Sequence, residues 1–455
     1  MKLNYDIMDK PRGIALFSLA VQQMLTILAA TIAVPMIVGN GLTPAATMFG
    51  AGAGTLVYIF FTKRKSHVFL GSSFSFLGSA LAAFAGGVSM QLGMLGLLIG
   101  AFAAGMVYVI LAAIVKKVGT GWVDTLMPPV VIGPTVSVIG LSLAGNAISD
   151  LQTGSTAELT EKGAAVTQYA AVFCGLVTLT ASVLCAVYGN KMIKLIPFLI
   201  GILCGYAAAM LLTFIGMATC SDALILIDLN AFRQGLMPDG AFSIRTLFSL
   251  PPFVFAEAFH GIHELSAEYV LTVVVAYVPV LFVAFAEHIA DHKNLSSVIG
   301  RDLLTEPGLE RTLLGVGLGS IVGTFFGGCP NTTYGESIAC VALTGNASVI
   351  TIIAASAGCI LLSFVTPFVV FISTVPNCVM GGLCMLLYGF IALSGFKMIQ
   401  HIDLDDNRNI FIISVILTAG IGGFCLHFCA VTVSQVASAM LLGIFVNLLV
   451  PAKKK

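Results

Sequence analysis

The sequence predicts an all-α polytopic membrane protein, and composition and patterning both indicate this class. Of its 455 residues, 58% are hydrophobic and 9% are charged, with 21 basic and 21 acidic side chains. Soluble domains carry about 25% charged residues, so a soluble enzyme is excluded. The apolar content excludes a disordered chain, and the lack of a basic patch excludes a nucleic-acid binder. The 48 glycines follow no collagen period and suit close helix contacts within a membrane.

Apolar runs of about 20 residues, the length that crosses a bilayer as a helix, recur along the chain. We expect fourteen such spans, of which the third and tenth are short or broken. A more polar stretch, residues 218–268, separates seven spans from seven and is expected to hold interfacial helices. The spans should begin near Ile14, Pro44, Val68, Leu92, Trp122, Ala164, Leu195, Tyr269, Arg311, Asn331, Ser348, Pro376, Ile410 and Ala430.

The placement of basic residues supports this count. With a cytoplasmic N-terminus, only Lys162, Arg233 and Arg245 among the 21 Lys and Arg residues fall on the opposite side. The positive-inside rule therefore favours fourteen spans with both termini in the cytoplasm. No cleavable signal peptide is expected, because the opening residues MKLNYDIMDKPRG lack a cleavage site.

Seven spans in each half would place the two halves in opposite orientation, as in the inverted repeats of secondary transporters. Weak sequence similarities between the two halves agree with an inverted repeat. HVFLGSSFSFLGS opens the third span and FFGGCPNTTYGES the tenth, while MPPVVIGP opens the fifth and VPNCVMGG the twelfth.

The matching interruptions of the third and tenth spans indicate a substrate site. Gly71 and Gly327–Gly328 allow extended backbone, and Pro330 disfavours helix just before it. We expect Asn331, Thr332 or Thr333 to cap a following half-helix. The alternative is a pair of glycine-rich packing kinks.

Three carboxylates lie within the expected spans, where charges are costly and usually functional. Glu287 and Asp291 are one helical turn apart in the eighth span, and Glu336 follows the break at Pro330. Glu336 could instead favour a helix N-terminus, and Asp291 could be a solvated charge at a helix end. A cavity with these groups would repel anions and suit cations or neutral rings with N–H donors. Like charges one turn apart should share a proton.

Two metal-like patterns are weaker signals. Cys425 and Cys429 are four residues apart, and His288, Asp291 and His292 spell H-x-x-D-H, similar to an inverted zinc-protease motif. Small buried cysteines and a packed or structurally hydrogen-bonded His288 are the expected alternatives. We predict neither a metal nor another cofactor.

Five stretches along the chain form a recognisable pattern. They are VQQMLTILAATIAVP, FLGSSFSFLGS, FAEHIADHKNLSSVIGRDLL, GGCPNTTYGESIACVALTG and VMGGLCMLLYGFIALSGFKM. Together they resemble the nucleobase–ascorbate transporters, also called nucleobase:cation symporter-2, across nearly the whole chain. The form TTYGES is similar to the uracil permease branch, whereas xanthine and urate members carry a glutamine–asparagine version.

The resemblance implies fourteen spans in a seven-plus-seven inverted repeat, short strands in spans 3 and 10, and a homodimer formed through a gate domain in the plasma (inner) membrane. The core domain would comprise residues 1–120 (spans 1–4) and 269–375 (spans 8–11). The gate domain would comprise residues 121–217 (spans 5–7) and 376–455 (spans 12–14 and the tail), with 218–268 as an outer loop.

The resemblance also implies a proton-coupled uracil importer and its site residues. Substrate contacts would come from Glu287 and Glu336, the backbone amides of Gly335 and Phe74, the lining residues Ala30 and Tyr334, and Tyr388 of the gate. Proton coupling would involve Asp291 with Glu287.

Two positions depart from the family pattern, and other functions stay open. Asp291 stands where many uracil permeases have histidine, and Gln22–Gln23 stands where many members have Gln-His. The first leaves the proton relay open, and the second removes an imidazole that could brace the core.

The alternative functions are transport of another purine or pyrimidine, an anion transporter of the same fold, and an intramembrane metalloenzyme.

Overall fold

The computed structural model is mostly helical and describes residues 3–119, 122, 128–155, 161–190, 192–236, 244–400, 402–428 and 431–450. Within these residues, nine helices are long and apolar enough to cross a membrane by length and composition. Four shorter apolar helices accompany them, Gly335–Thr344, Val349–Ser363, Asn407–Ile421 and Gln435–Leu449. The predicted helical class of the chain therefore agrees with the structure.

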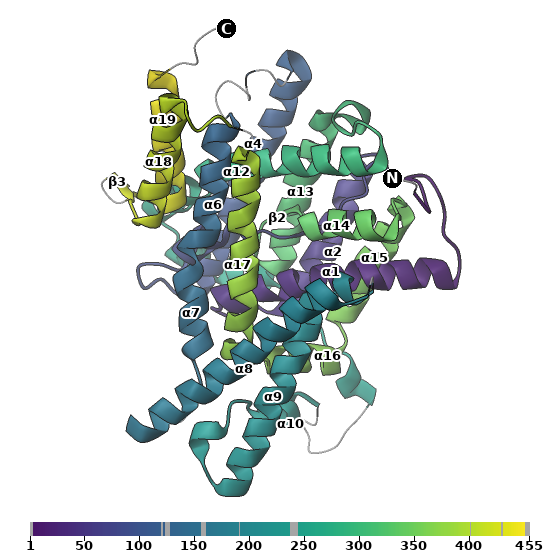
Figure 1. Cartoon of the computed structure of the whole chain (residues 1–455), viewed down its shortest axis with the longest axis vertical. Helices are drawn as coiled ribbons and strands as arrows, with labels where there is room; N and C mark the ends of the chain where they lie inside the picture. The colour runs from purple at the N-terminus through teal and green to yellow at the C-terminus, as the bar shows by residue number, and fades with distance from the viewer. Residues whose placement is uncertain are drawn as a thin grey trace.

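The first half of the chain runs from α1 to η4 (Figure 1). Its elements are α1 (Ile14–Val38), α2 (Pro44–Phe61), β1 (Leu70–Ser72), α3 (Leu77–Ala83), α4 (Met90–Val118), α6 (Pro129–Ser142), α7 (Ala144–Gln152), α8 (Glu161–Tyr188), η1 (Ile193–Leu195), α9 (Pro197–Thr219), η2 (Asp222–Leu224), α10 (Leu229–Leu236), η3 (Ile244–Leu247), α11 (Val254–Ala258) and η4 (Phe259–Glu264).

The second half begins with the longest helix. Its elements are α12 (Ala267–Ile299), η5 (Leu304–Gly308), α13 (Leu309–Gly327), β2 (Asn331–Thr333), α14 (Gly335–Thr344), α15 (Val349–Ser363), α16 (Thr366–Ser373), α17 (Asn377–Ile399), α18 (Asn407–Ile421), β3 (Leu426–Phe428), β4 (Val431–Val433) and α19 (Gln435–Leu449).

Most expected span starts coincide with the start of an element. Thirteen of the fourteen lie within three residues of a helix or strand start, and the exception is the one near Trp122. Residues 123–127 and Ala430 lie outside the described residues, and the nearest helices begin at Pro129 and Gln435. The sequence did not predict α16, the division between α6 and α7, or the β3–β4 hairpin. Short helices do occur within residues 218–268, as expected.

Helices from equivalent positions of the two halves pack against each other through glycines. In α2, a Cβ added at Gly50 would lie 2.3 Å from the carbonyl oxygen of Gly323 in α13. In α6, a Cβ at Gly140 would lie 2.3 Å from the carbonyl oxygen of Tyr388 in α17. Small residues let backbones approach this closely. The helix at the expected second span thus meets the helix at the expected ninth, and the same holds for the expected fifth and twelfth.

The arrangement separates two groups of helices. In Figure 1, α8, α9 and α10 lie at one end of the long axis, α18 and α19 at the other, and α6, α7 and α17 between them. The helices α1, α2, α14 and α15 lie to one side of this row, as does the N-terminus. The short strands are hydrogen-bonded to two helices, because the Thr55 hydroxyl of α2 donates to the Leu70 carbonyl of β1 and the Asn331 N–H of β2 donates to the Ser320 hydroxyl of α13.

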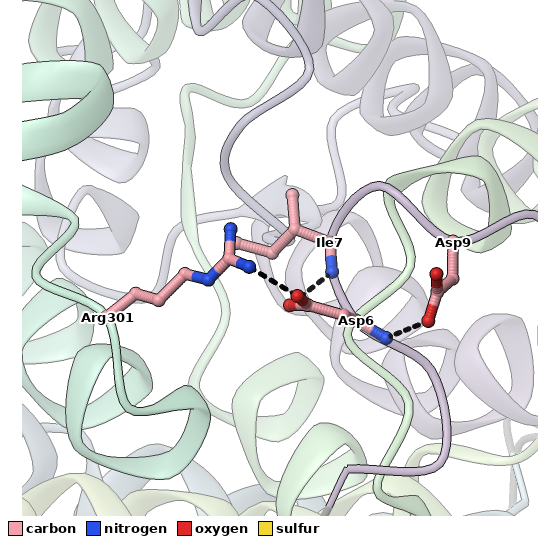
Figure 2. A network of polar contacts seen from close by, with 4 residues as sticks. All are labelled: Asp6, Ile7, Asp9 and Arg301. Carbon is pink, nitrogen blue, oxygen red and sulfur yellow. Dashed lines mark hydrogen bonds and ion pairs between the residues drawn. The ribbon is translucent and has the colours of Figure 1, made fainter.

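The segment before α1 is bound to the second half of the chain by hydrogen bonds and an ion pair. The amide N–H groups of Asn4 and Tyr5 donate to the carbonyl of Gly345, at 2.7 and 3.2 Å. Figure 2 shows that the Asp6 carboxylate pairs with Arg301, just beyond α12, and accepts the N–H of Ile7. The N-terminal segment therefore joins the end of α12 to the link between α14 and α15.

We expect Gly50→Ala to destabilise the protein, because its methyl group would overlap the Gly323 carbonyl and separate α2 from α13. Overpacking of this kind costs about 1–3 kcal/mol. The matched control is Gly145→Ala in α7, where a Cβ would meet nothing within 4 Å. Thermal unfolding in detergent checks both variants. A melting temperature for Gly50→Ala equal to that of Gly145→Ala would contradict the close contact.

Candidate functional site

The two interrupted spans meet as an antiparallel pair of strands. Leu70 pairs with Thr333, Gly71 with Thr332 and Ser72 with Asn331, and all six residues are buried. Two hydrogen bonds extend the pair, from Ser73 N–H to the Pro330 carbonyl and from Tyr334 N–H to the Phe69 carbonyl. Backbone groups that leave a helix inside a membrane need such partners. The prediction that both breaks belong to one structural site is supported.

A close contact fixes the side chains around this pair. The Tyr334 hydroxyl donates to the carbonyl of Ser72 at 2.9 Å, so its ring covers Gly71. A Cβ on Gly71 would lie 2.4 Å from that ring, which explains why glycine is needed there. On the other side, the Gln23 amide of α1 donates to the Ser337 hydroxyl, which also accepts the Phe69 N–H at 3.2 Å.

A half-helix follows each strand, and the N-terminus of each lacks a side-chain cap. The N-cap residues are Phe76 for α3 and Tyr334 for α14, and neither makes a side-chain cap hydrogen bond. The first N–H groups of a helix have no partner within it and carry partial positive charge. Because the Leu77 N–H donates to the Phe74 carbonyl at 3.0 Å and the Ser337 N–H to the Tyr334 carbonyl at 3.1 Å, the other N–H groups of these first turns are the ones that can bind a carbonyl or anionic group.

The prediction that Asn331, Thr332 or Thr333 caps α14 is wrong. These residues form β2, and two of their side chains are already engaged. The Asn331 amide donates to the Gly50 carbonyl at 3.2 Å, and the Thr333 hydroxyl donates to Asp291 Oδ2 at 2.5 Å. Tyr334 is left as the N-cap, with Gly335 and Glu336 opening the helix.

The carboxylates of α12 face these strands. Glu287 Oε2 accepts the Ser75 hydroxyl at 3.0 Å, and Asp291 lies 4.0 Å from where a Cβ of Gly335 would be. Asp291 precedes the end of α12 at Ile299 by two turns and is bound to β2, so it is not a solvated charge at a helix end. Glu287 and Asp291 are one turn apart on α12, and Glu336 follows Gly335 at the start of α14, beside Asp291.

The remaining predicted residues lie on neighbouring elements. Phe74 follows β1, and its ring meets that of Tyr388 in α17 edge to face, with centroids 6.2 Å apart. Ala30 of α1 belongs to the same buried apolar cluster as Tyr334 and Tyr388. The structure therefore places Tyr388 beside the site from a helix outside the strand-bearing group.

A cavity of about 320 Å³ opens beside this contact. Its wall includes Phe74 and Ser75 on one side and Asn146, Ser434 and Gln435 on the other. Because the Ser75 hydroxyl donates to Glu287, the cavity adjoins the carboxylate site. The mixture of hydroxyl, amide and aromatic side chains suits a small polar ring.

The two histidines of α12 hold helices together. Both are buried, and His288 Nε2 is 2.9 Å from the Thr312 hydroxyl of α13. That hydroxyl donates to the Leu309 carbonyl, so His288 must be the donor. His292 Nδ1 donates to the His288 carbonyl at 2.9 Å, and its Nε2 therefore accepts the Tyr58 hydroxyl at 2.8 Å. The structural hydrogen bond predicted for His288 is present.

The metal-like patterns find no support in the geometry. No group of three His, Cys, Asp or Glu side chains that could hold a metal occurs within the described ranges. Both ring nitrogens of His292 are hydrogen-bonded. The cysteine pair cannot be compared with the structure, because Cys429 lies outside the described residues.

Sequence reasoning missed the groups that orient the carboxylates. Ser75 and Thr333 donate their hydroxyls to Glu287 and Asp291. The Ser337 hydroxyl, also missed, accepts the Gln23 amide. The available signal was the clustering of serine and threonine around both breaks. Gln23 braces α1 against α14 from the position where a histidine is common in the family that the motifs resemble.

The fold is that of membrane transporters. The murine Slc26a9 anion transporter in its inward-facing state is similar with a TM-score of 0.64 at 12% identity, over 97% of this chain and 68% of that one. The transmembrane domain of the cyanobacterial bicarbonate transporter BicA gives a TM-score of 0.57 at 15% identity, over 97% and 99%. At these identities the likeness shows the fold alone.

Sequence relatives identify the family. A model described as the permease family matches residues 14–428. The chain is 34% identical to the uracil permease of Bacillus subtilis (strain 168), over 100% of this chain and 97% of the relative. It is 32% identical to the uracil permease of Escherichia coli (strain K12), over 97% and 93%. The chain belongs to this permease family, the nucleobase–ascorbate transporters; it is a multi-pass membrane transporter and not an enzyme.

We expect Tyr58→Phe to lower the stability of the protein by about 1–3 kcal/mol, the cost of leaving a buried acceptor without a donor. His292 Nε2 loses the Tyr58 hydroxyl, and the Ser66 hydroxyl at 3.4 Å is poorly placed to replace it. Thermal unfolding measures the effect, with Tyr169→Phe at a position 77% exposed as the control. Equal melting temperatures for the two variants would show that the histidine does not need this donor.

Proposed function

We propose that this protein is a proton-coupled importer of uracil that works by alternating access between a core and a gate domain. The observation that carries the proposal is the convergence of Glu287 and Glu336 on two uncapped helix N-termini beside paired strands. The uracil permeases of Bacillus subtilis, Bacillus caldolyticus and Escherichia coli, at 32–35% identity, supply the substrate class.

Uracil matches this set of groups chemically. Its ring carries N–H donors next to carbonyl acceptors, and it has no charge. In the proposed complex, Glu336 and Glu287 accept ring N–H groups, and the backbone amides of Gly335 and Phe74 donate to ring carbonyls. Ala30 and Tyr334 line the pocket, and Tyr388 contacts the ring from the gate. Hydrogen bonds to a charged acceptor are stronger than neutral ones.

The proposed architecture has fourteen crossings in a seven-plus-seven inverted repeat. It is supported by the contacts of equivalent elements, α2 with α13, β1 with β2 and α6 with α17. Residues 1–120 and 269–375 would form the core, and residues 121–217 and 376–455 the gate. Two copies would pair through the gate in the plasma (inner) membrane, with both termini cytoplasmic, as the distribution of Lys and Arg suggests.

The proton would be carried by Asp291 together with Glu287. They lie one turn apart on α12, and like charges this close resist simultaneous ionisation. The pair would share one proton, and substrate binding at Glu287 would change the affinity of the pair for that proton. By linkage, protonation of the pair would change the affinity for substrate to the same extent. The Thr333 hydroxyl would hold the Asp291 carboxylate in place.

Anion transport is the weaker alternative. The similar solved structures include anion transporters, but three carboxylates at the site would repel anions. Another purine or pyrimidine would satisfy the same donor and acceptor pattern. A competition panel of nucleobases against labelled uracil uptake separates these substrates, since only bases that bind this site will reduce uptake.

Glu336→Gln should weaken uracil binding about tenfold or more, because a charge-assisted hydrogen bond worth roughly 1.5–3 kcal/mol is lost. Glutamine keeps the shape but presents a mixed donor and acceptor group. Binding is measured on the purified protein, with Glu257→Gln at an exposed position as the control. Unchanged uracil affinity in Glu336→Gln would remove this residue from the site.

Uptake into proteoliposomes should follow an imposed proton gradient and collapse when a protonophore is added. The reason is that clustered carboxylates offer a protonatable site. The control is a sodium gradient with protons equilibrated across the membrane. Full uptake under that sodium gradient alone would refute proton coupling.

Asp291→Asn should shift the pH profile of uptake while exchange of bound for free uracil survives, because the substitution removes one proton-binding group and its repulsion. Asp291→His should restore coupled uptake with an altered profile. Uptake is measured against pH for wild type and both variants. Superimposable profiles would show that Asp291 has no part in coupling.

A further inference from the structure

A surface groove lies between α1 and α15, and none of its lining residues lines the cavity beside the carboxylates. Its volume is about 550 Å³. Leu16, Phe17 and Met24 line it from α1, and Ala354, Gly358 and Leu361 line it from α15. Phe17 and Leu361 are 72% and 69% exposed, whereas Ala355 at the floor is 1% exposed.

The groove exists because small residues face large ones. On α15 the lining residues Ala354, Ala355, Ala357 and Gly358 leave the backbone uncovered. A Cβ at Gly358 would meet only the flexible end of Met24, at 3.3 Å. In a membrane protein an apolar hollow on the outer surface is filled by hydrocarbon, since the bilayer interior holds little water.

Two basic residues stand at one end of the groove. Its lining begins at Gly13, and Lys10 and Arg12, both exposed, come immediately before it. Neither has an ion pair within the part of the chain that the structure describes. The acids of the same segment are engaged, Asp6 with Arg301 and Asp9 with the Asp6 N–H (Figure 2).

The segment that carries these cations is held in place. The Ser348 hydroxyl donates to the Asp9 carbonyl at 2.6 Å, and the Val349 N–H donates to the Ile7 carbonyl at 3.2 Å. Because Val349 opens α15 and Gly13 precedes α1, these bonds fix the basic end relative to both walls of the groove.

We propose that this groove binds one acyl chain of an anionic phospholipid, whose phosphate pairs with Lys10 and Arg12. A membrane supplies both parts of the ligand in one molecule, and a basic cluster beside a membrane helix attracts anionic headgroups. A second apolar hollow, of about 440 Å³ on α8 and α9, has no Lys or Arg next to any of its lining residues in the sequence, whereas Arg12 adjoins Gly13 of the groove. This hollow should bind lipid acyl chains without preferring one headgroup over another.

The test measures lipid binding to the full-length purified protein in detergent. Phosphatidylglycerol and phosphatidylcholine with the same acyl chains are titrated, and bound lipid is counted by native mass spectrometry. The variants are Lys10→Gln with Arg12→Gln, which removes the charges, and Gly358→Leu, which fills the groove. The matched control is Ala181→Leu, which fills the hollow on α8. Melting temperatures without lipid confirm that each variant is folded.

Phosphatidylglycerol should bind more tightly than phosphatidylcholine to the wild type. The double glutamine variant should weaken phosphatidylglycerol binding about thirtyfold, the combined effect of two basic residues near an anionic surface, and leave phosphatidylcholine unchanged. Gly358→Leu should weaken both lipids on the order of tenfold, the effect of about two displaced methylene groups. Ala181→Leu should leave the preference for phosphatidylglycerol intact.

Three results would overturn the proposal. Equal binding of phosphatidylglycerol by the wild type and the double glutamine variant would remove the headgroup site. Inorganic phosphate competing as well as the lipid would show an ion site without an acyl chain. A shift from dimer to monomer in Gly358→Leu would show that a second copy of the chain fills the groove.

Discussion

The antiparallel pairing of Leu70–Ser72 with Asn331–Thr333 is the interaction on which the centre of this protein depends. Two spans that stop being helical inside a bilayer expose backbone groups, and each must find a partner there. Each break satisfies the other, so neither is stable alone. The pairing also fixes where α3 and α14 begin, and therefore where the N–H groups of their first turns point. The candidate site is a direct consequence of this pairing.

The electrostatics of the site follow from the same arrangement. Glu336 opens α14, while Glu287 and Asp291 approach the strands from α12. Their repulsion is offset by partial positive charge at the helix N-termini and by the hydroxyls of Ser75 and Thr333. This arrangement is the basis of the proposed neutral ligand that donates hydrogen bonds and of the proposed shared proton. His288 and His292 play no part in this balance, since their nitrogens hold α12 to α13 and α2.

The sequence predicted the helices well because membrane spans depend on apolar length, and it located both breaks because glycine and proline mark them. It also identified the three carboxylates, since charge within an apolar run stands out. The strand register escaped prediction because strands of three residues are too short to show a period of two. The predicted cap on α14 failed for a tertiary reason: Thr333 gives its hydroxyl to Asp291, a residue distant in sequence. Ser75 was missed because nothing local distinguishes it from the serines beside it.

The Tyr334 hydroxyl reaches back to Ser72 across 262 positions of the chain. During synthesis, β1 therefore enters the membrane long before β2 exists. Its N–H and C=O groups have to be sheltered by water, lipid headgroups or the insertion machinery until α13 and β2 follow. The paired strands of the candidate site can assemble only after more than two thirds of the polypeptide has been made. Truncated or stalled chains of this protein would thus carry an unpaired strand edge within the bilayer, a feature that quality-control proteases could recognise.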